Sequence, residues 1–133
     1  MNSQEYKEKA CEIFKNDLFA TQTTGIEIEE VGKDYAKCSL KIDDRHRNAN
    51  GLAMGGAIFT LADFAFAIAS NIETYNAVSL SSTIEYMRAV GDGTIYAEAR
   101  CRKDGRRVCF YEIVVSDENG KTIAVVSSSG FRS

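Results

Sequence analysis

The longest apolar segment of the chain lies near its middle, from about Gly56 to Ser70. Its apolar residues are Ile58, Phe59, Leu61, Ala62, Phe64, Ala65, Phe66, Ala67, Ile68 and Ala69. On a helix these residues point in nearly every direction, and a helix that is apolar all round must be enclosed by protein. We therefore predict a long central helix wrapped by a sheet, with any apolar side left over covered by a second chain.

Shorter segments on either side show the periodicity of a second helix and of strands. Apolar residues recur at helical spacing from about Gln4 to Phe19. Two segments before the central helix, GIEIEEV and DYAKCSLKI, are typical of a hairpin, and in the second one Ala36, Cys38, Leu40 and Ile42 alternate with outward-facing residues. Four more strand-like segments follow the central helix: AVSLSSTIEYM, TIYAEARCR, RVCFYEIVVS and KTIAVVSSSGF, separated by the turn sequences VGDG, KDGR and ENGK.

This order of elements predicts the fold class. Helices kept apart from an antiparallel sheet define an α+β protein, here with a curved sheet around the central helix. The 133 residues show no internal repeat, no linker and no proline, and a chain of this length can form one core. We predict a single domain over residues 1–133.

Composition and charge narrow the classes of function. The formal net charge is −3 and the basic residues are scattered, so the basic surface of a nucleic-acid-binding protein is missing. The first residues, MNSQEYKEKACEIF, lack the basic and apolar regions of an export signal, and no apolar segment reaches membrane-spanning length without interruption. We expect a cytoplasmic protein that binds neither nucleic acid nor membrane.

The cysteine and histidine residues do not form a metal-binding pattern. Four cysteines occur without a C-x-x-C pair and His46 is the single histidine, so the ligand set of a structural zinc site is absent. Cys101 and Cys109 flank a predicted hairpin turn and could face each other, but a reducing cytosol favours free thiols. We predict neither a disulfide nor a metal site.

A single charged residue, Asp63, interrupts the central apolar segment. An ionised carboxylate among apolar side chains is costly unless it is paired, hydrogen-bonded or reached by water. No basic residue lies within one helical turn of it. Asp63 therefore either lies at a wet rim, bonded to a neighbouring amide, or is a carboxylate in a desolvated cleft that acts as a base.

Two consecutive glycines, Gly55 and Gly56, stand where the central helix is predicted to begin. A helix start presents unpaired N–H groups and a positive dipole end, which suit an oxygen that gains negative charge, and glycine lets a ligand approach the backbone. Asp63 is seven residues beyond Gly56, roughly 10 Å further along the axis. If both groups serve one site, Asp63 must meet the glycine turn of another chain, as in a two-fold dimer with antiparallel helices.

The segment HRNANGLAMGGAIFTLAD resembles the motif of the hotdog-fold thioesterases, specifically the phenylacetate-pathway acyl-CoA thioesterase group. That motif reads H-x-N-x-x-G-x-x-H-G-G and continues through a turn containing phenylalanine to L-A-D. The matching residues are His46, Asn48, Gly51, Gly55, Gly56, Phe59, Leu61, Ala62 and Asp63. The resemblance covers almost the whole chain. It departs from the family at Met54, where relatives have histidine, and at Ala89, where they often have proline.

The resemblance implies a role for each matching residue. Asp63 would be the general base that activates water, or else the nucleophile, and the Gly55 amide would polarise the thioester carbonyl. Asn48 would shape the site and position the water or the carbonyl. Ser79 falls where some relatives have a hydroxyl that orients the water, and an ordinary strand serine is the equal alternative. His46 is predicted to be structural, and the chemistry requires no metal or other cofactor.

Further residues are expected to contact the substrate. Met54 and Gly56 flank Gly55 at the glycine turn, and methionine can neither titrate nor donate a hydrogen bond as the family histidine does. In the family, basic residues bind the phosphates of coenzyme A. Arg88, Arg106 and Arg107 are the candidates, because the arginine fork suits phosphate; a solvated hairpin tip is the alternative.

The function expected from the resemblance is hydrolysis of an aryl or aliphatic acyl-CoA by a homodimer or a dimer of dimers. Because Met54 stands in place of the family histidine, the alternative is a non-catalytic hotdog protein that binds acyl-CoA. A hotdog dehydratase is the minor alternative, because it would require His46 and Asp63 to form an acid–base pair, and their spacing does not favour one.

Overall fold

The computed structural model describes all residues, 1–133. Two α-helices and six strands form its framework: α1 (Ser3–Phe14), β1 (Glu27–Gly32), β2 (Tyr35–Lys41), α2 (Gly55–Asn71), β3 (Ala77–Tyr86), β4 (Thr94–Asp104), β5 (Val108–Ser116) and β6 (Thr122–Arg132). A π-helix, Phe19–Thr24, precedes β1, and a 3-10 turn, Asp44–His46, follows β2. The predicted helices and strands are all present, in the predicted order.

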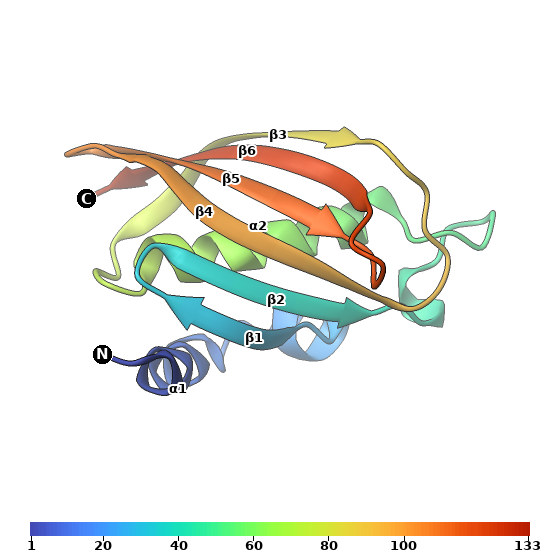
Figure 1. Ribbon diagram of the computed structural model, residues 1–133, viewed down its shortest axis with the longest axis horizontal. Helices are drawn as coiled ribbons and strands as arrows, with labels where there is room; N and C mark the ends of the chain where they lie inside the picture. Colours follow the sequence, from blue (N-terminus) through green and yellow to red (C-terminus); the bar gives the residue numbers. More distant parts are fainter.

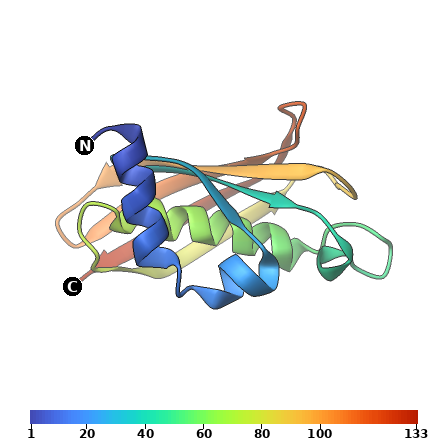
Figure 2. The same cartoon turned by 90° about the horizontal axis from the view of Figure 1, so that it is seen from below.

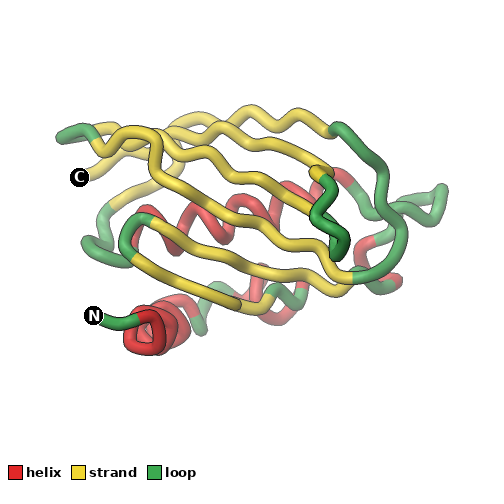
Figure 3. Tube along the Cα trace, in the orientation of Figure 1, coloured by secondary structure: helices red, strands yellow, loops and turns green.

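The six strands form one antiparallel sheet with the order β1-β2-β4-β5-β6-β3. The sheet curves over α2, which lies along one of its faces (Figures 1 and 3). Figure 2 shows α1 crossing one end of the molecule and the π-helix beside α2. This is the α+β hotdog fold that the sequence predicts.

The core lies between the concave face of the sheet and α2. Along β2, Ala36, Cys38 and Leu40 are at most 1% exposed, as their alternation with polar residues predicts. From α2, Leu61 and Ile68 are fully buried against the sheet. The apolar character of α2 thus serves mainly to fill the curve of the sheet.

The N-terminal helix is shorter than the predicted range Gln4–Phe19. It begins with a capping box in which Asn2 and Glu5 bond each other's backbone N–H, and it ends at Phe14, whose ring packs edge-on against Phe64. Asn and Asp at positions 16 and 17 favour turns over helix, so the helix ends before them. Leu18, predicted on the buried face of this helix, is instead 52% exposed.

The cysteines carry no cross-link, and all four are free. In the β4–β5 ladder Cys109 pairs with Asp104 and Cys101 with Tyr111, because the hairpin turn lies closer to Cys109 than to Cys101. The idea that Cys101 and Cys109 face each other is therefore wrong. No group of three or more potential metal-binding side chains occurs, and neither helix has the length and apolar character needed to cross a membrane.

The β3 edge of the sheet is open. β3 pairs only with β6, so its other side carries unpaired backbone groups. Val78 and Leu80, on this strand, are 67% and 60% exposed. An exposed edge strand with apolar side chains is the kind of surface on which another strand can pair.

Candidate active site

One face of α2 is not covered by the sheet and carries Gly56, Thr60, Asp63 and Ala67, spaced by three or four residues. Three cavities follow this face from its start to its end, with volumes of about 450, 320 and 400 Å³. We call them the entry cavity, the Asp63 cavity and the far cavity. The sequence predicted a leftover apolar side here, whereas the residues are small or polar.

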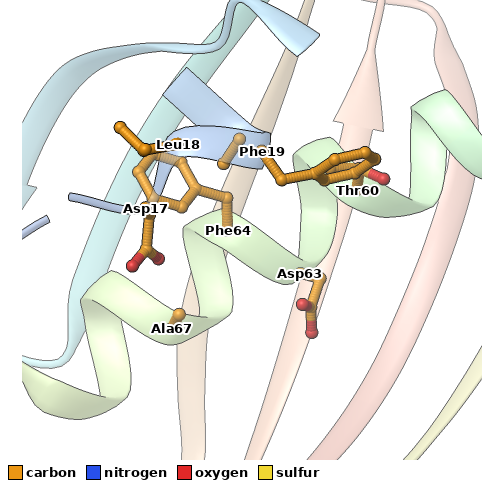
Figure 4. A pocket seen from close by; sticks show the side chains of 8 residues that line it. Asp17, Leu18, Phe19, Thr60, Asp63, Phe64 and Ala67 are labelled. Carbon is orange, nitrogen blue, oxygen red and sulfur yellow. The ribbon is translucent and has the colours of Figure 1, made fainter. Parts of the chain in front are cut away.

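Asp63 is half-buried and lines the middle cavity, on the same side of α2 as Thr60 (Figure 4). Burial is the main influence and raises the pKa of Asp63 above the ordinary value of an aspartate. The Ser79 hydroxyl acts in the opposite direction, and the nearby Asp17 carboxylate raises the pKa further. No basic group contributes, so Asp63 is a carboxylate with the enhanced basicity that a general base needs.

Ser79 approaches Asp63 from β3. It pairs with Gly130 across the β3–β6 ladder and lines the far cavity, which shares Asp17 and Ala67 with the Asp63 cavity. The Ser79 hydroxyl lowers the pKa of Asp63 through a side-chain hydrogen bond to its carboxylate, and a hydroxyl oxygen can still accept a hydrogen bond from a water molecule. The structure therefore brings together two of the four predicted catalytic residues.

The helix start offers two free donors. Helix α2 begins at Gly55, one residue earlier than predicted, and neither the Gly55 nor the Gly56 N–H has a partner within the chain. Met54 precedes them as the N-cap with an exposed side chain, while its carbonyl accepts the N–H groups of Ala57 and Ile58. Two adjacent unpaired N–H groups at a helix start are suited to bind a carbonyl oxygen.

Gly55 is in close contact with Tyr86, the last residue of β3. The Tyr86 hydroxyl donates a hydrogen bond to the Gly55 carbonyl at 2.9 Å. A Cβ atom at position 55 would lie only 2.9 Å from the same oxygen, whereas a Cβ at Gly56 would meet nothing within 4 Å. The sequence indicates only the direction of Tyr86, because side chains alternate along β3 and Ile84 and Tyr86 therefore lie on the face toward α2.

This difference between the two glycines gives a matched pair of variants. In Gly55→Ala the new methyl group must displace Tyr86, so we expect hydrolysis to fall on the order of 10- to 100-fold through misplacement of the donor. Gly56→Ala should keep a rate close to that of the wild type. Thioester hydrolysis at saturating substrate measures both, and equal rates for the two variants would show that the Tyr86 contact does not matter.

Asn48 and His46 use their side chains to hold the backbone. The Asn48 Oδ1 accepts the N–H groups of Asn50 and Leu52, at 2.9 and 3.1 Å, and so orders the loop before the helix. His46 is buried, with its Nδ1 accepting from the Asp43 N–H and its Nε2 donating to the Thr24 carbonyl. With both ring nitrogens bonded to the backbone, His46 matches its predicted structural role.

The position of His46 also argues against the dehydratase alternative. It lines the entry cavity together with Met54 and Gly56, whereas Asp63 lines the next cavity along α2. An acid–base pair would require the two side chains to face one substrate atom. Neither nitrogen of His46 is free to do so.

The three arginines lie at opposite ends of the sheet. Arg88 lines a separate cavity of about 430 Å³ with Gly55 and Asn48, just beyond the end of β3. Arg106 and Arg107 are exposed in the β4–β5 turn, where the Arg107 carbonyl bonds the Arg132 N–H near the start of β3. The length of β3 separates these two ends, about 30 Å at 3.3 Å per residue.

Within one chain, then, the predicted residues fall into separate groups. Asp63 is eight residues beyond Gly55, about 12 Å along the helix axis. Asp63 and Ser79 share one region, while Gly55, Asn48 and Arg88 share another. A carbonyl bound at Gly55 is out of reach of Asp63 in the same chain, so one site can contain both groups only if a second chain supplies one of them.

Comparison with known proteins agrees with this fold. Residues 50–124 match the family model of the thioesterase superfamily. A putative esterase of Archaeoglobus fulgidus is 34% identical over 122 residues, which cover 90% of this chain and 78% of that protein. The acyl-coenzyme A thioesterase PaaI of Escherichia coli is 30% identical over 127 residues, covering 94% and 89% of the two chains.

The structure of the E. coli PaaI protein from the phenylacetic acid degradation operon superposes with a TM-score of 0.89 at 27% identity, over 98% of this chain and 95% of that one. The hotdog fold is thus shared with proteins of known family. The chain belongs to the thioesterase superfamily, in its PaaI-like group.

Proposed function

We propose that this protein hydrolyses acyl-CoA thioesters, with Asp63 of one chain and the Gly55 amide of a second chain in the same site. As a member of its superfamily the protein is a thioester hydrolase, and acyl-coenzyme A is the substrate named for its E. coli relative. The observation that carries the proposal is the half-buried Asp63, whose pKa is raised and which no basic group neutralises. A carboxylate in that environment is suited to take a proton from water.

The open β3 edge supports the arrangement of two chains. Pairing two β3 strands antiparallel about a two-fold axis would extend the sheet and cover Val78 and Leu80. The same axis would make the two α2 helices antiparallel, which carries Asp63 of each chain toward Gly55 of the other. A homodimer is the smallest assembly that contains a complete site, and a dimer of dimers would contain two such homodimers.

The reaction follows from these positions. The Gly55 N–H, with Gly56 beside it, donates to the thioester oxygen as it gains charge. Asp63 takes a proton from water, oriented by Ser79, while the water oxygen bonds to the acyl carbon. The carbon–sulfur bond then breaks, and the proton passes from Asp63 to the thiolate of coenzyme A. The products are the free acid and coenzyme A, with no metal or cofactor in any step.

The remaining predicted residues have supporting parts in this proposal. Asn48 keeps the loop before the helix in shape, and its Nδ2 remains free to donate toward the bound carbonyl or water. Met54 lines the entry cavity without adding a polar group. Arg88 of one chain, with Arg106 and Arg107 of the other, would hold the phosphates of coenzyme A, because the arginine fork suits phosphate oxygens.

Met54 also supports the second candidate, a protein that binds acyl-CoA without hydrolysing it. The release of coenzyme A thiol from aryl-acetyl, benzoyl, short-chain and long-chain acyl-CoA separates the two candidates. We expect turnover of at least one acyl class by the wild-type protein. Tight binding of acyl-CoA with no thiol release from any member of the panel would favour the binding protein instead.

A further inference from the structure

Phe19 lies between the Asp63 cavity and the entry cavity. It is the first residue of the π-helix, and it and Thr60 are the two residues that line both cavities. Figure 4 shows the Phe19 ring beside Thr60, one helical turn before Asp63. The ring therefore forms a wall across the uncovered face of α2.

The core does not account for this position of Phe19. Its side chain is 65% exposed, and the neighbouring Leu18 is 52% exposed, while Ala20, the next residue, is buried. The irregular π-helix turns the ring toward α2, and π-helices occur frequently at functional sites. An exposed phenylalanine that borders two cavities contributes little to folding, so its removal should leave the fold intact.

We propose that Phe19 sets the length of the acyl group that the protein accepts. The proposal rests on the proposed function. With the ring in place, an acyl group bound near Asp63 is confined to a cavity of about 320 Å³, lined by Leu18, Phe64 and Ala67. This volume suits short or aryl acyl groups. Without the ring, that cavity joins the entry cavity of about 450 Å³, and a long aliphatic chain can extend along α2 toward Ala57.

The neighbour Leu18 provides the matched control. It is exposed to a similar extent and comes from the same segment, but it lines only the Asp63 cavity and does not border the entry cavity. Leu18→Ala therefore widens one cavity without joining two. Phe19→Trp keeps and enlarges the wall.

The test compares kcat/KM for butanoyl-CoA, phenylacetyl-CoA and dodecanoyl-CoA among wild type, Phe19→Ala, Phe19→Trp and Leu18→Ala. We expect Phe19→Ala to raise the ratio of dodecanoyl-CoA to butanoyl-CoA at least about tenfold, because several methylenes gain apolar contacts. The gain should appear mainly as a lower KM for the long chain. Phe19→Trp should leave the ratio at or below its wild-type value, and Leu18→Ala should change it much less than Phe19→Ala.

An unchanged ratio in Phe19→Ala, or the same change in Leu18→Ala, would overturn the proposal. If no variant hydrolyses any thioester, the proposed function fails, and the affinities for the same acyl-CoAs decide about Phe19. If only Phe19→Ala then binds dodecanoyl-CoA more strongly, the result supports Phe19 as the residue that limits acyl length. Equal binding by all four proteins would refute that role. Circular dichroism shows that each variant is folded.

Discussion

Replacing Asp63 with asparagine is expected to lower kcat by a factor on the order of 10² to 10⁴, the usual contribution of a general base. The amide has nearly the same shape as the carboxylate but cannot accept the proton of water at neutral pH. KM should change little, because Asp63 acts on the water and not on the bound thioester. Thiol release under saturating acyl-CoA measures the effect.

Asp17 provides the control for this variant, because it is the other carboxylate that lines the Asp63 cavity. Asp17→Asn should retain most of the rate at neutral pH. It should also shift the acid side of the pH–rate profile to lower pH, since Asp17 is one of the groups that raise the pKa of Asp63. Equal loss of activity in both variants, or none in Asp63→Asn, would contradict the assignment of the base.

The Asp63→Asn substitution should also stabilise the folded chain at neutral pH. The pKa of Asp63 is higher in the folded chain than in the unfolded chain, so the protonated carboxyl favours folding and its ionisation opposes folding as pH rises through the folded-state pKa. Asparagine does not ionise, so the variant does not lose this folding stability. We expect a higher Tm for Asp63→Asn at pH 7 and little difference below the ordinary pKa of aspartate, as checked by thermal unfolding at both pH values.

Mixing two inactive variants is expected to restore activity. In Gly55→Pro the donor N–H is removed and the proline Cβ displaces Tyr86, as in Gly55→Ala. Proline otherwise suits the first position of a helix, and Met54 already has the extended backbone that precedes proline. This variant alone should lose a factor of about 10² to 10³ in kcat, as for other lost donors to a developing oxyanion. Asp63→Asn alone should lose the factor of about 10² to 10⁴ given above.

In a mixed dimer of these variants, one of the two sites combines an intact Asp63 from one chain with an intact Gly55 from the other. Random exchange of subunits in an equal mixture should therefore restore about one quarter of the wild-type rate. The mixture is unfolded and refolded together, and the separately refolded variants serve as controls. A rate equal to the average of the two variants would show that Asp63 and Gly55 do not come from different chains.

Much of the fold is predictable because burial leaves a periodic record in the sequence. The alternation in β2 and the all-round apolar pattern of α2 follow directly from a sheet curved over a helix. The isolated charge of Asp63 and the free donors at Gly55 are also visible in the sequence, since each depends on local position in one helix. These features are fixed by the identity and spacing of neighbouring residues.

Other features depend on contacts between distant segments. The hydrogen bond from Tyr86 to Gly55 joins the end of β3 to the start of α2, and periodicity shows only which way Tyr86 faces. The exposure of Leu18 depends on the turn that the chain makes before β1 and on how that turn lies against α2. The division of the α2 face by Phe19 follows from that turn, and no local pattern indicates it.

A single turnover in water labelled with ¹⁸O tests the central claim most directly, that Asp63 activates water to attack the thioester. The protein is kept in excess over an acyl-CoA that it hydrolyses, and the acid product is examined by mass spectrometry. General-base catalysis predicts that the acid formed in the first turnover carries one oxygen from the labelled water. An unlabelled acid with ¹⁸O incorporated into Asp63 would contradict this claim, because it would show that the carboxylate itself attacked.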